Sequence, residues 1–212
     1  ITWYADPDNP ARYPWNAGEM VVTSGDVTFD FETALLPAER GDVYGFAKSE
    51  AFDLGSRHGV FKFDRKRTTV IDFFQKASPS VLRAEAALEG SGLCAVDMGM
   101  VGFSRTGLQR LFALAESVIG GRATVIGQLR SGRLSVDLYV ELIMAFLAGV
   151  PRERYLEKVR PLSTVEEPAL DRIHGAFRGA DFRAFLTRHT QFIHFGSLHE
   201  YPVSCEILAA AS

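Results

Sequence analysis

Apolar residues recur along the chain with two different periods, one typical of strands and one typical of helices. Residues 58–64 and 68–75 alternate between apolar and polar positions around the charged run "DRKRT", which predicts a β-hairpin. Other alternating or continuous apolar runs predict further strands, and the long run at 93–103 is typical of a central strand. These further strands are expected over 19–23, 27–32 (a strand or a bend), 42–49 and 93–103.

Four segments have a helical period and begin or end at residues that commonly cap helices. They are a helix with Ser78 as N-cap and Pro79 as its first residue, one over 104–117 capped by Ser104, one over 135–149 ending at Gly149, and one over 164–177 capped by Thr164.

Near the end of the chain, "ADFRAFLT" and "QFIHFG" are expected to pair as strands. Strands and helices therefore interleave, and several strands are apolar on both faces. This favours an α/β layered domain with a mixed sheet. The expected organisation is an N-terminal loop or docking segment over 1–18, the α/β domain over 19–202, and the truncated start of a C-terminal region over 203–212.

Composition agrees with one sizeable core, since 47% of the 212 residues are hydrophobic and 16 are Phe. The net charge is −3 without a basic stripe, so nucleic acid is not an expected partner. No apolar run approaches the roughly 18 residues of a membrane span. Two distant cysteines, Cys94 and Cys205, and the lack of a signal segment favour the cytoplasm.

The run "VVTSGDVTF" ends an apolar strand with Gly25 and Asp26, where open α/β sheets often bind ligands. Asp26 is a candidate ligand for Mg²⁺ beside phosphates. The alternative is a strand followed by a turn that the Asp stabilises.

Two other candidates are cationic. "LGSRHGVFKFD" brackets Arg57 and His58 with glycines, and these side chains are candidate donors at the mouth of a site. In "FFQKAS", Lys76 follows a strand and precedes a helix, a position suited to binding a phosphate, although a surface lysine is the simpler interpretation.

Acids and a histidine within apolar runs complete the candidates. Asp97 interrupts "VDMGMVGF", with Gly99 leaving room beside it, and is either a ligand-binding acid or a satisfied core residue. His194 lies between aromatic residues and is more often structural in such a setting. Asp137 and Glu141 share a helix face, either towards a site or towards solvent. No zinc spacing, phosphate loop or nucleophile elbow is present.

The order of these motifs resembles the fucose-1-phosphate guanylyltransferases (GDP-fucose pyrophosphorylases), including the pyrophosphorylase half of bifunctional fucokinase/guanylyltransferases. The resemblance runs from about Glu19 to Tyr201. It rests on Gly-Asp after a strand, followed by "GSRHGVFKFD", "DFFQKAS", "VDMGMVGFS", "VDLYVELIMAFLAG" and "FIHFGSLHEY".

This resemblance implies a Rossmann-like nucleotidyltransferase core with a mixed sheet, followed by a left-handed β-helix. The family's N-terminal glycine-rich nucleotide loop has no counterpart here, most of the β-helix is missing, and no kinase motif is present. The first residue is Ile1, so we expect a piece of a longer protein.

The implied activity joins a sugar 1-phosphate to a nucleoside triphosphate with release of pyrophosphate, forming GDP-fucose or a related sugar nucleotide. The implied cofactor is Mg²⁺ on Asp26, and Lys76 corresponds to the lysine that contacts the sugar phosphate. His194 stands where many sugar nucleotidyltransferases carry a second metal-binding aspartate.

Arg57 and His58 are expected to assist Lys76. Asp97, beside Gly99, corresponds to a sugar-contacting position, and Tyr139 and Glu141 are expected to help read the sugar hydroxyls. The alternatives are a non-catalytic module for sugar-phosphate binding or assembly, and a segment of a fucokinase parent.

Overall fold

The structure is a computed structural model. It describes residues 18–24, 27–30, 39–64, 68–121, 123–147, 149–187 and 191–194, with the backbone alone for 27–30 and 191–194. The predicted docking segment (apart from Gly18) and the predicted C-terminal region at 203–212 lie outside these residues. Within the described part of the chain, no helix combines the length and the apolar character needed to cross a bilayer.

The main sheet has six strands and is mixed, which confirms the predicted α/β class. Its order is β5-β4-β6-β3-β9, and β1 pairs with the second half of β6. Only the β3–β9 pair is parallel among the described ladders. The strands are β1 (Met20–Thr23), β3 (Val43–Glu50), β4 (Gly59–Phe63), β5 (Val70–Gln75), β6 (Cys94–Phe103) and β9 (Phe182–Leu186).

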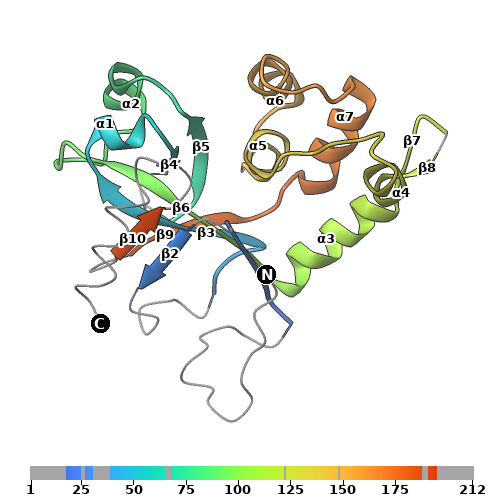
Figure 1. The fold of residues 1–212 in the computed structure, drawn as a ribbon, viewed down its shortest axis with the longest axis horizontal. Helices are drawn as coiled ribbons and strands as arrows, with labels where there is room; N and C mark the ends of the chain where they lie inside the picture. Colours follow the sequence, from blue (N-terminus) through green and yellow to red (C-terminus); the bar gives the residue numbers. More distant parts are fainter. Residues whose placement is uncertain are drawn as a thin grey trace, which may run out of the picture.

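Strand β6 is central because both of its faces are covered by apolar side chains. On one face, Ala95, Val101 and Phe103 belong to the main core. On the other face, Cys94 and Val96 pack with a smaller cluster from the helices α1 (Phe52–Gly55) and α2 (Pro79–Glu85). Figure 1 shows α1 and α2 beside β4 and β5, and the other helices gathered on the opposite side of the molecule.

The remaining helices cover the main-core face. They are α3 (Arg105–Glu116), α4 (Val125–Arg130), the π-helix η3 (Leu138–Leu142), α5 (Ile143–Phe146), α6 (Arg152–Val159) and α7 (Glu167–Phe177). Between α3 and α4 lies a two-stranded ribbon of β7 (Val118–Ile119) and β8 (Ala123–Thr124).

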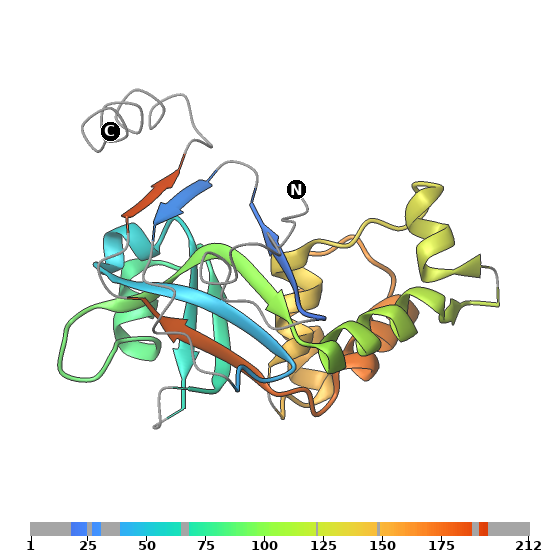
Figure 2. The same cartoon turned by 90° about the horizontal axis from the view of Figure 1, so that it is seen from below.

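All of these helices belong to one excursion of the chain between β6 and β9 (Figure 2). Its two ends meet at Asp42, just before β3. The carbonyl oxygen of Asp42 accepts from Ser104 N–H at 3.0 Å, and the Asp42 N–H donates to the carbonyl oxygen of Asp181 at 2.8 Å. Both ends of the helical excursion are therefore hydrogen-bonded to one residue just before β3.

The sheet also curls so that its far edges approach each other. Thr69, just before β5, forms an isolated bridge with Arg183 of β9, and the N–H of Ala184 donates to Thr68 at 3.3 Å. The rings of Phe61 and Phe182 lie inside this curl, 5.9 Å apart.

The predicted strands are found, with one error of pairing. The "ADFRAFLT" strand (β9) runs parallel to β3, whereas the "QFIHFG" strand, β10 (Gln191–His194), pairs with β2 (Val27–Asp30). The predicted partnership of these two strands is therefore wrong. Strand β9 extends the main sheet at β3, where Phe182 and Ala184 are fully buried.

Two helix predictions need correction. The expected helix at 135–149 is η3 followed by the short α5, because Asp137 caps it by accepting from the N–H groups of Tyr139 and Val140. Helix α7 begins three residues after the predicted cap Thr164, and its N-cap residue Glu166 makes no side-chain capping bond. Helices α1, α4 and α6 were not predicted from the sequence.

Candidate functional site

The two glycines of "LGSRHG" are required by packing. A Cβ added to Gly55 would lie 2.6 Å from Sγ of Cys94, and one added to Gly59 would lie 2.3 Å from Cζ of Phe73. Neither residue has a positive φ. The loop between α1 and β4 is therefore pressed onto the sheet, which fixes where the intervening residues stand.

The cationic candidates meet at the start of β4. Arg57 is exposed and His58 is half-buried. The N–H of Lys76, at the end of β5, donates to the carbonyl oxygen of His58 at 3.0 Å. Lys76 is exposed and has a φ of 51°, in the left-handed region that costs about 1–2 kcal/mol for a residue with a Cβ. Such strain tends to persist at functional sites.

Asp97 lies in the middle of β6 and is 5% exposed. Its Oδ1 is buried and has no hydrogen-bond partner among the described residues. Burial raises the pKa of Asp97 to about 7, while backbone N–H groups of Gly99 and Met98 hold it lower than burial alone would. A carboxyl with this pKa can exist in either protonation state near neutral pH.

Gly99 marks an irregularity in β6. Strand β3 pairs Gly45 with Val101 and Ala47 with Asp97, so β6 bulges between these two pairs. Gly99 lies in the bulge with a φ of 72°, a conformation that favours glycine. Bulges of this kind often redirect side chains next to sites.

The end of β1 comes to the same place, since the N–H of Ser24 donates to the carbonyl oxygen of Gly99 at 2.8 Å. Asp26, two residues further along, lies outside the described residues. His194 is described by its backbone alone and pairs with Val27 in the β2–β10 ladder. The residue that follows Asp26 is thus the register partner of His194.

Tyr139 lies on η3 and is half-buried. Its ring stacks against Phe73 of β5, with centroids 6.5 Å apart and planes 18° apart. Because Phe73 covers Gly59, this stacking places Tyr139 on the main-core face of the β4–β5 hairpin.

Glu141 makes contacts of a different kind. It is 3% exposed, and its Oε2 accepts from the N–H of Asp137 at 2.6 Å, while the hydroxyl of Ser163 donates to Oε1. These bonds tie η3 to the segment before α7.

The structure therefore brings the backbones of Arg57, His58 and Lys76 together at the start of β4. Asp97 lies on β6, the strand next to β4, and Glu141 makes hydrogen bonds within the helical layer.

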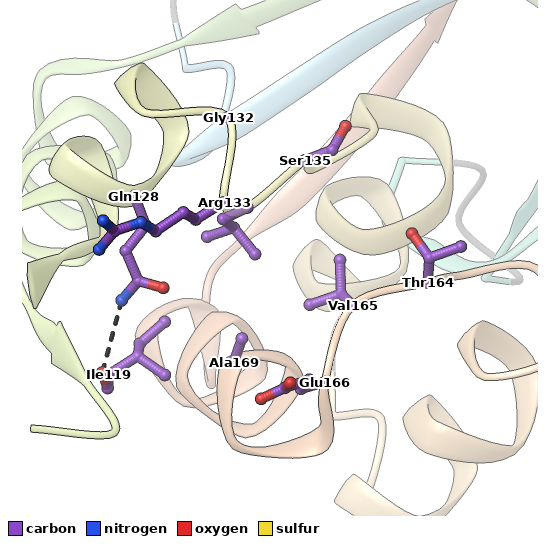
Figure 3. Close-up of a pocket in the computed structure, with 10 residues that line it drawn as sticks. Ile119, Gln128, Gly132, Arg133, Ser135, Thr164, Val165, Glu166 and Ala169 are labelled. Atoms are coloured by element: carbon purple, nitrogen blue, oxygen red, sulfur yellow. Dashed lines mark hydrogen bonds between the residues drawn. The ribbon is translucent and has the colours of Figure 1, made fainter. Parts of the chain in front are cut away.

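A cavity of about 710 Å³ lies elsewhere, among the helices (Figure 3). Its lining includes Gln128, Arg133, Thr164 and Glu166, and it contains none of the residues predicted as a site. Gln128 is held there by hydrogen bonds from its Nε2 to the carbonyl oxygens of Ile119 and Ala123.

Among the described residues, no group of three or more His, Cys, Asp or Glu side chains is placed to hold a metal ion. Mg²⁺ beside phosphates commonly needs only one or two carboxylates, with substrate oxygens and water as the other ligands. The Mg²⁺ prediction rests on Asp26 and stays a prediction.

Comparison with known families agrees with the motif order. A family model described as the fucose pyrophosphorylase domain matches residues 7–205. The chain belongs to the fucose pyrophosphorylase family.

The fucose pyrophosphorylase chain is also similar to two solved structures of HddC from Yersinia pseudotuberculosis, one of them complexed with GMP-PN. In both, the identity is 14% and the TM-score is 0.40. The alignments cover 94% of this chain and 59% of the HddC chain. A comparison with curated proteins found no match.

One residue of the region was not selected from the sequence. Gln75, beside Lys76, is half-buried and its Oε1 is buried without a hydrogen-bond partner among the described residues. The signal in the sequence was the Gln-Lys pair of "FFQKAS", in which a glutamine ends an apolar strand.

Proposed function

We propose that this member of the fucose pyrophosphorylase family is a sugar-1-phosphate nucleotidyltransferase that forms GDP-fucose, or a related sugar nucleotide, from fucose 1-phosphate and GTP. One observation carries the proposal: Lys76, at the end of β5, is held in a strained backbone conformation beside His58, and His58 leads into β4, the strand next to the one that carries the buried carboxyl of Asp97. A cation for a phosphate and an acceptor for hydroxyls are the two groups that a sugar phosphate needs.

In the proposed reaction, an oxygen of the sugar 1-phosphate attacks the α-phosphorus of the triphosphate. A new P–O bond forms, the bond from the α-phosphorus to the bridging oxygen breaks, and pyrophosphate leaves. The attacking phosphate is already ionised, so the protein contributes mainly positioning and neutralisation of charge.

Lys76 would hold the sugar phosphate as a point charge, assisted by the guanidinium of Arg57 or the ring of His58. All three would reach the sugar phosphate from the junction of β4 and β5, where Gly55 and Gly59 are tightly packed. Mg²⁺, held by Asp26, would neutralise charge on the phosphates.

The test is pyrophosphate release by the protein in the full length that its gene encodes, with a panel of sugar 1-phosphates, the four triphosphates and Mg²⁺. We expect turnover with fucose 1-phosphate and GTP, and a loss of at least tenfold in kcat/KM for Lys76→Ala. Lys62→Ala is the matched control, because Lys62 lies on the same hairpin and pairs with Glu85 at 2.9 Å.

Absence of pyrophosphate release from every pair would overturn the proposal. Binding of a sugar 1-phosphate without turnover, measured by calorimetry, would instead support a non-catalytic binding module.

A further inference from the structure

The cavity among the helices is bordered by two stretches of chain that are neither helix nor strand. One is the 133–136 segment, between α4 and η3, and the other is the 163–166 segment, between α6 and α7. Residues of both segments line the cavity, and Figure 3 shows them on different sides of it. The cavity of about 710 Å³ therefore lies between two lengths of irregular backbone.

Both segments have the alternating exposure of an extended chain. Exposed polar residues take turns with half-buried residues, three of which pack against the main core. The exposed residues are Arg133, Ser135, Thr164 and Glu166, and the half-buried ones are Leu134, Val136, Ser163 and Val165. A period of two is that of a β-strand. Each segment thus resembles a strand outside any sheet.

The backbone of both segments is only partly used. Among the described residues, the N–H groups of Ser135 and Val136 have no hydrogen-bond acceptor, and neither do those of Thr164 and Glu166. No described ladder joins the two segments to each other or to a strand. Unpaired N–H and C=O groups along an extended segment can pair with a further extended chain.

One buried side chain fastens the two segments to the same point. Oε2 of Glu141 accepts from the N–H of Asp137, directly after the first segment, and Oε1 accepts from the hydroxyl of Ser163 in the second. Glu141 is 3% exposed, so both bonds are shielded from water. The borders of the cavity are therefore set by the fold itself.

The two segments carry opposite charges. Arg133 and Glu166 both line the cavity, and neither has an ion-pair partner among the described residues. Glu166 also makes no capping bond at the start of α7. Opposite charges fixed on two sides of a cavity favour a ligand with the complementary pair of charges.

We propose that this cavity is a docking site for an extended peptide segment of a partner protein, with an acidic side chain opposite Arg133 and a basic side chain opposite Glu166. In this mode of recognition, main-chain hydrogen bonds provide affinity and side-chain contacts provide specificity. A peptide backbone supplies regularly spaced donors and acceptors for two unpaired segments, which a small metabolite does not. The site goes beyond the proposed activity, because Lys76 and the other predicted site residues do not line it.

The experiment selects short random peptides displayed on phage against the protein in the full length that its gene encodes. The affinity of an enriched peptide is then measured by fluorescence anisotropy. We expect the enriched sequences to share an acidic and a basic residue, and Arg133→Ala and Glu166→Ala each to weaken binding at least tenfold. Arg130→Ala is the matched control, because Arg130 is exposed at the end of α4 but does not line the cavity.

Charge reversal tests the pairing directly. Arg133→Glu should lose the enriched peptide and bind a version in which Lys replaces the acidic residue. Amide hydrogen exchange measures the backbone part of the interaction, and the bound peptide should slow exchange at Ser135, Thr164 and Glu166 at least tenfold. The urea midpoints of both alanine variants should equal that of wild type, since neither side chain has a partner among the described residues to lose.

The inference is overturned if no peptide sequence is enriched, or if the enriched peptides bind both alanine variants as tightly as wild type. Protection from exchange that lies elsewhere on the protein would overturn it as well. A cavity that takes up only small metabolites gives the first of these results. None of the measurements depends on turnover, so the outcome is independent of the proposed function.

Discussion

The backbone N–H of Lys76 donates to the carbonyl oxygen of His58, and this 3.0 Å bond joins the end of β5 to the start of β4. It sets two predicted phosphate-binding residues side by side although they are far apart in sequence. Lys76 is exposed and its side chain is not packed into the core. Its left-handed conformation is therefore held by the surrounding backbone, including this bond.

We expect Lys76→Gly to separate function from stability. Glycine adopts a positive φ without strain, which stabilises the folded variant. It also gains conformational freedom in the unfolded chain, which partly offsets that effect. The free energy of unfolding should be unchanged or higher by up to about 1 kcal/mol, while the affinity for a sugar 1-phosphate falls at least tenfold. Urea unfolding and calorimetric titration measure the two effects, and unaltered affinity would remove Lys76 from the site.

Asp97 should make stability depend on pH. Its pKa of about 7 in the folded protein lies above the ordinary value of 3.8, so the folded state retains a proton that the unfolded state loses. Stability should therefore fall as the pH rises from about 4 to about 7 and level off above that. Asp97→Asn removes this dependence and should be more stable than wild type at pH 8 by a few kcal/mol, at ~1.4 kcal/mol per pKa unit.

Urea unfolding of wild type and Asp97→Asn at pH 5 and pH 8 gives the comparison. A difference that is the same at both pH values would contradict the raised pKa. Asp53→Asn is a suitable control because Asp53 is exposed on α1.

Ser163→Ala should test the role of Glu141. The Ser163 hydroxyl donates to the buried carboxylate of Glu141, and its loss leaves that oxygen without this donor. We expect a loss of about 1–3 kcal/mol in unfolding free energy and no change in KM for the sugar phosphate. A raised KM with normal stability would instead return Glu141 to the sugar site.

Asp72 should anchor helix α6 to the edge strand β5. Its side chain is 7% exposed and forms ion pairs with Arg154, at 3.2 Å, and with Lys158. Asp72→Asn keeps the shape of the side chain and an oxygen that can accept from the N–H of Phe73, but it removes the negative charge. We expect a loss of roughly 1–3 kcal/mol, smaller in 1 M salt than at low ionic strength, in thermal unfolding monitored by circular dichroism.

The strands of the main sheet were predictable because their apolar alternation reflects burial directly. β6 is the clearest case, since its length and apolar character indicate a strand covered on both faces. The hairpin was equally predictable from the charged turn. Ser78 and Ser104 were correct as N-caps because their side chains accept from the N–H groups of Val81 and Gly107.

The pairing of β9 and the start of the helices after η3 were not predictable from local pattern. β9 pairs with β3 because the chain returns to Asp42 after a long excursion, a tertiary relationship that no short window contains. Thr164 has the right chemistry for a cap, yet the helix starts three residues later, at Glu167, with Glu166 as its N-cap.

For the site, the sequence indicated Lys76 and Asp97 but not Gln75. A charged residue in an apolar run stands out, whereas a glutamine at a strand end does not. Its significance depends on the glycine opposite it, and that partnership exists only once β4 and β5 are in register.

The meeting of both ends of the helical excursion at Asp42 has an evolutionary consequence. An insert that leaves and re-enters a scaffold at one point can be lengthened, shortened or exchanged while the strands carrying Lys76 and Asp97 keep their places. An exchange of the helical half at this junction would leave the strand order of the main sheet unchanged.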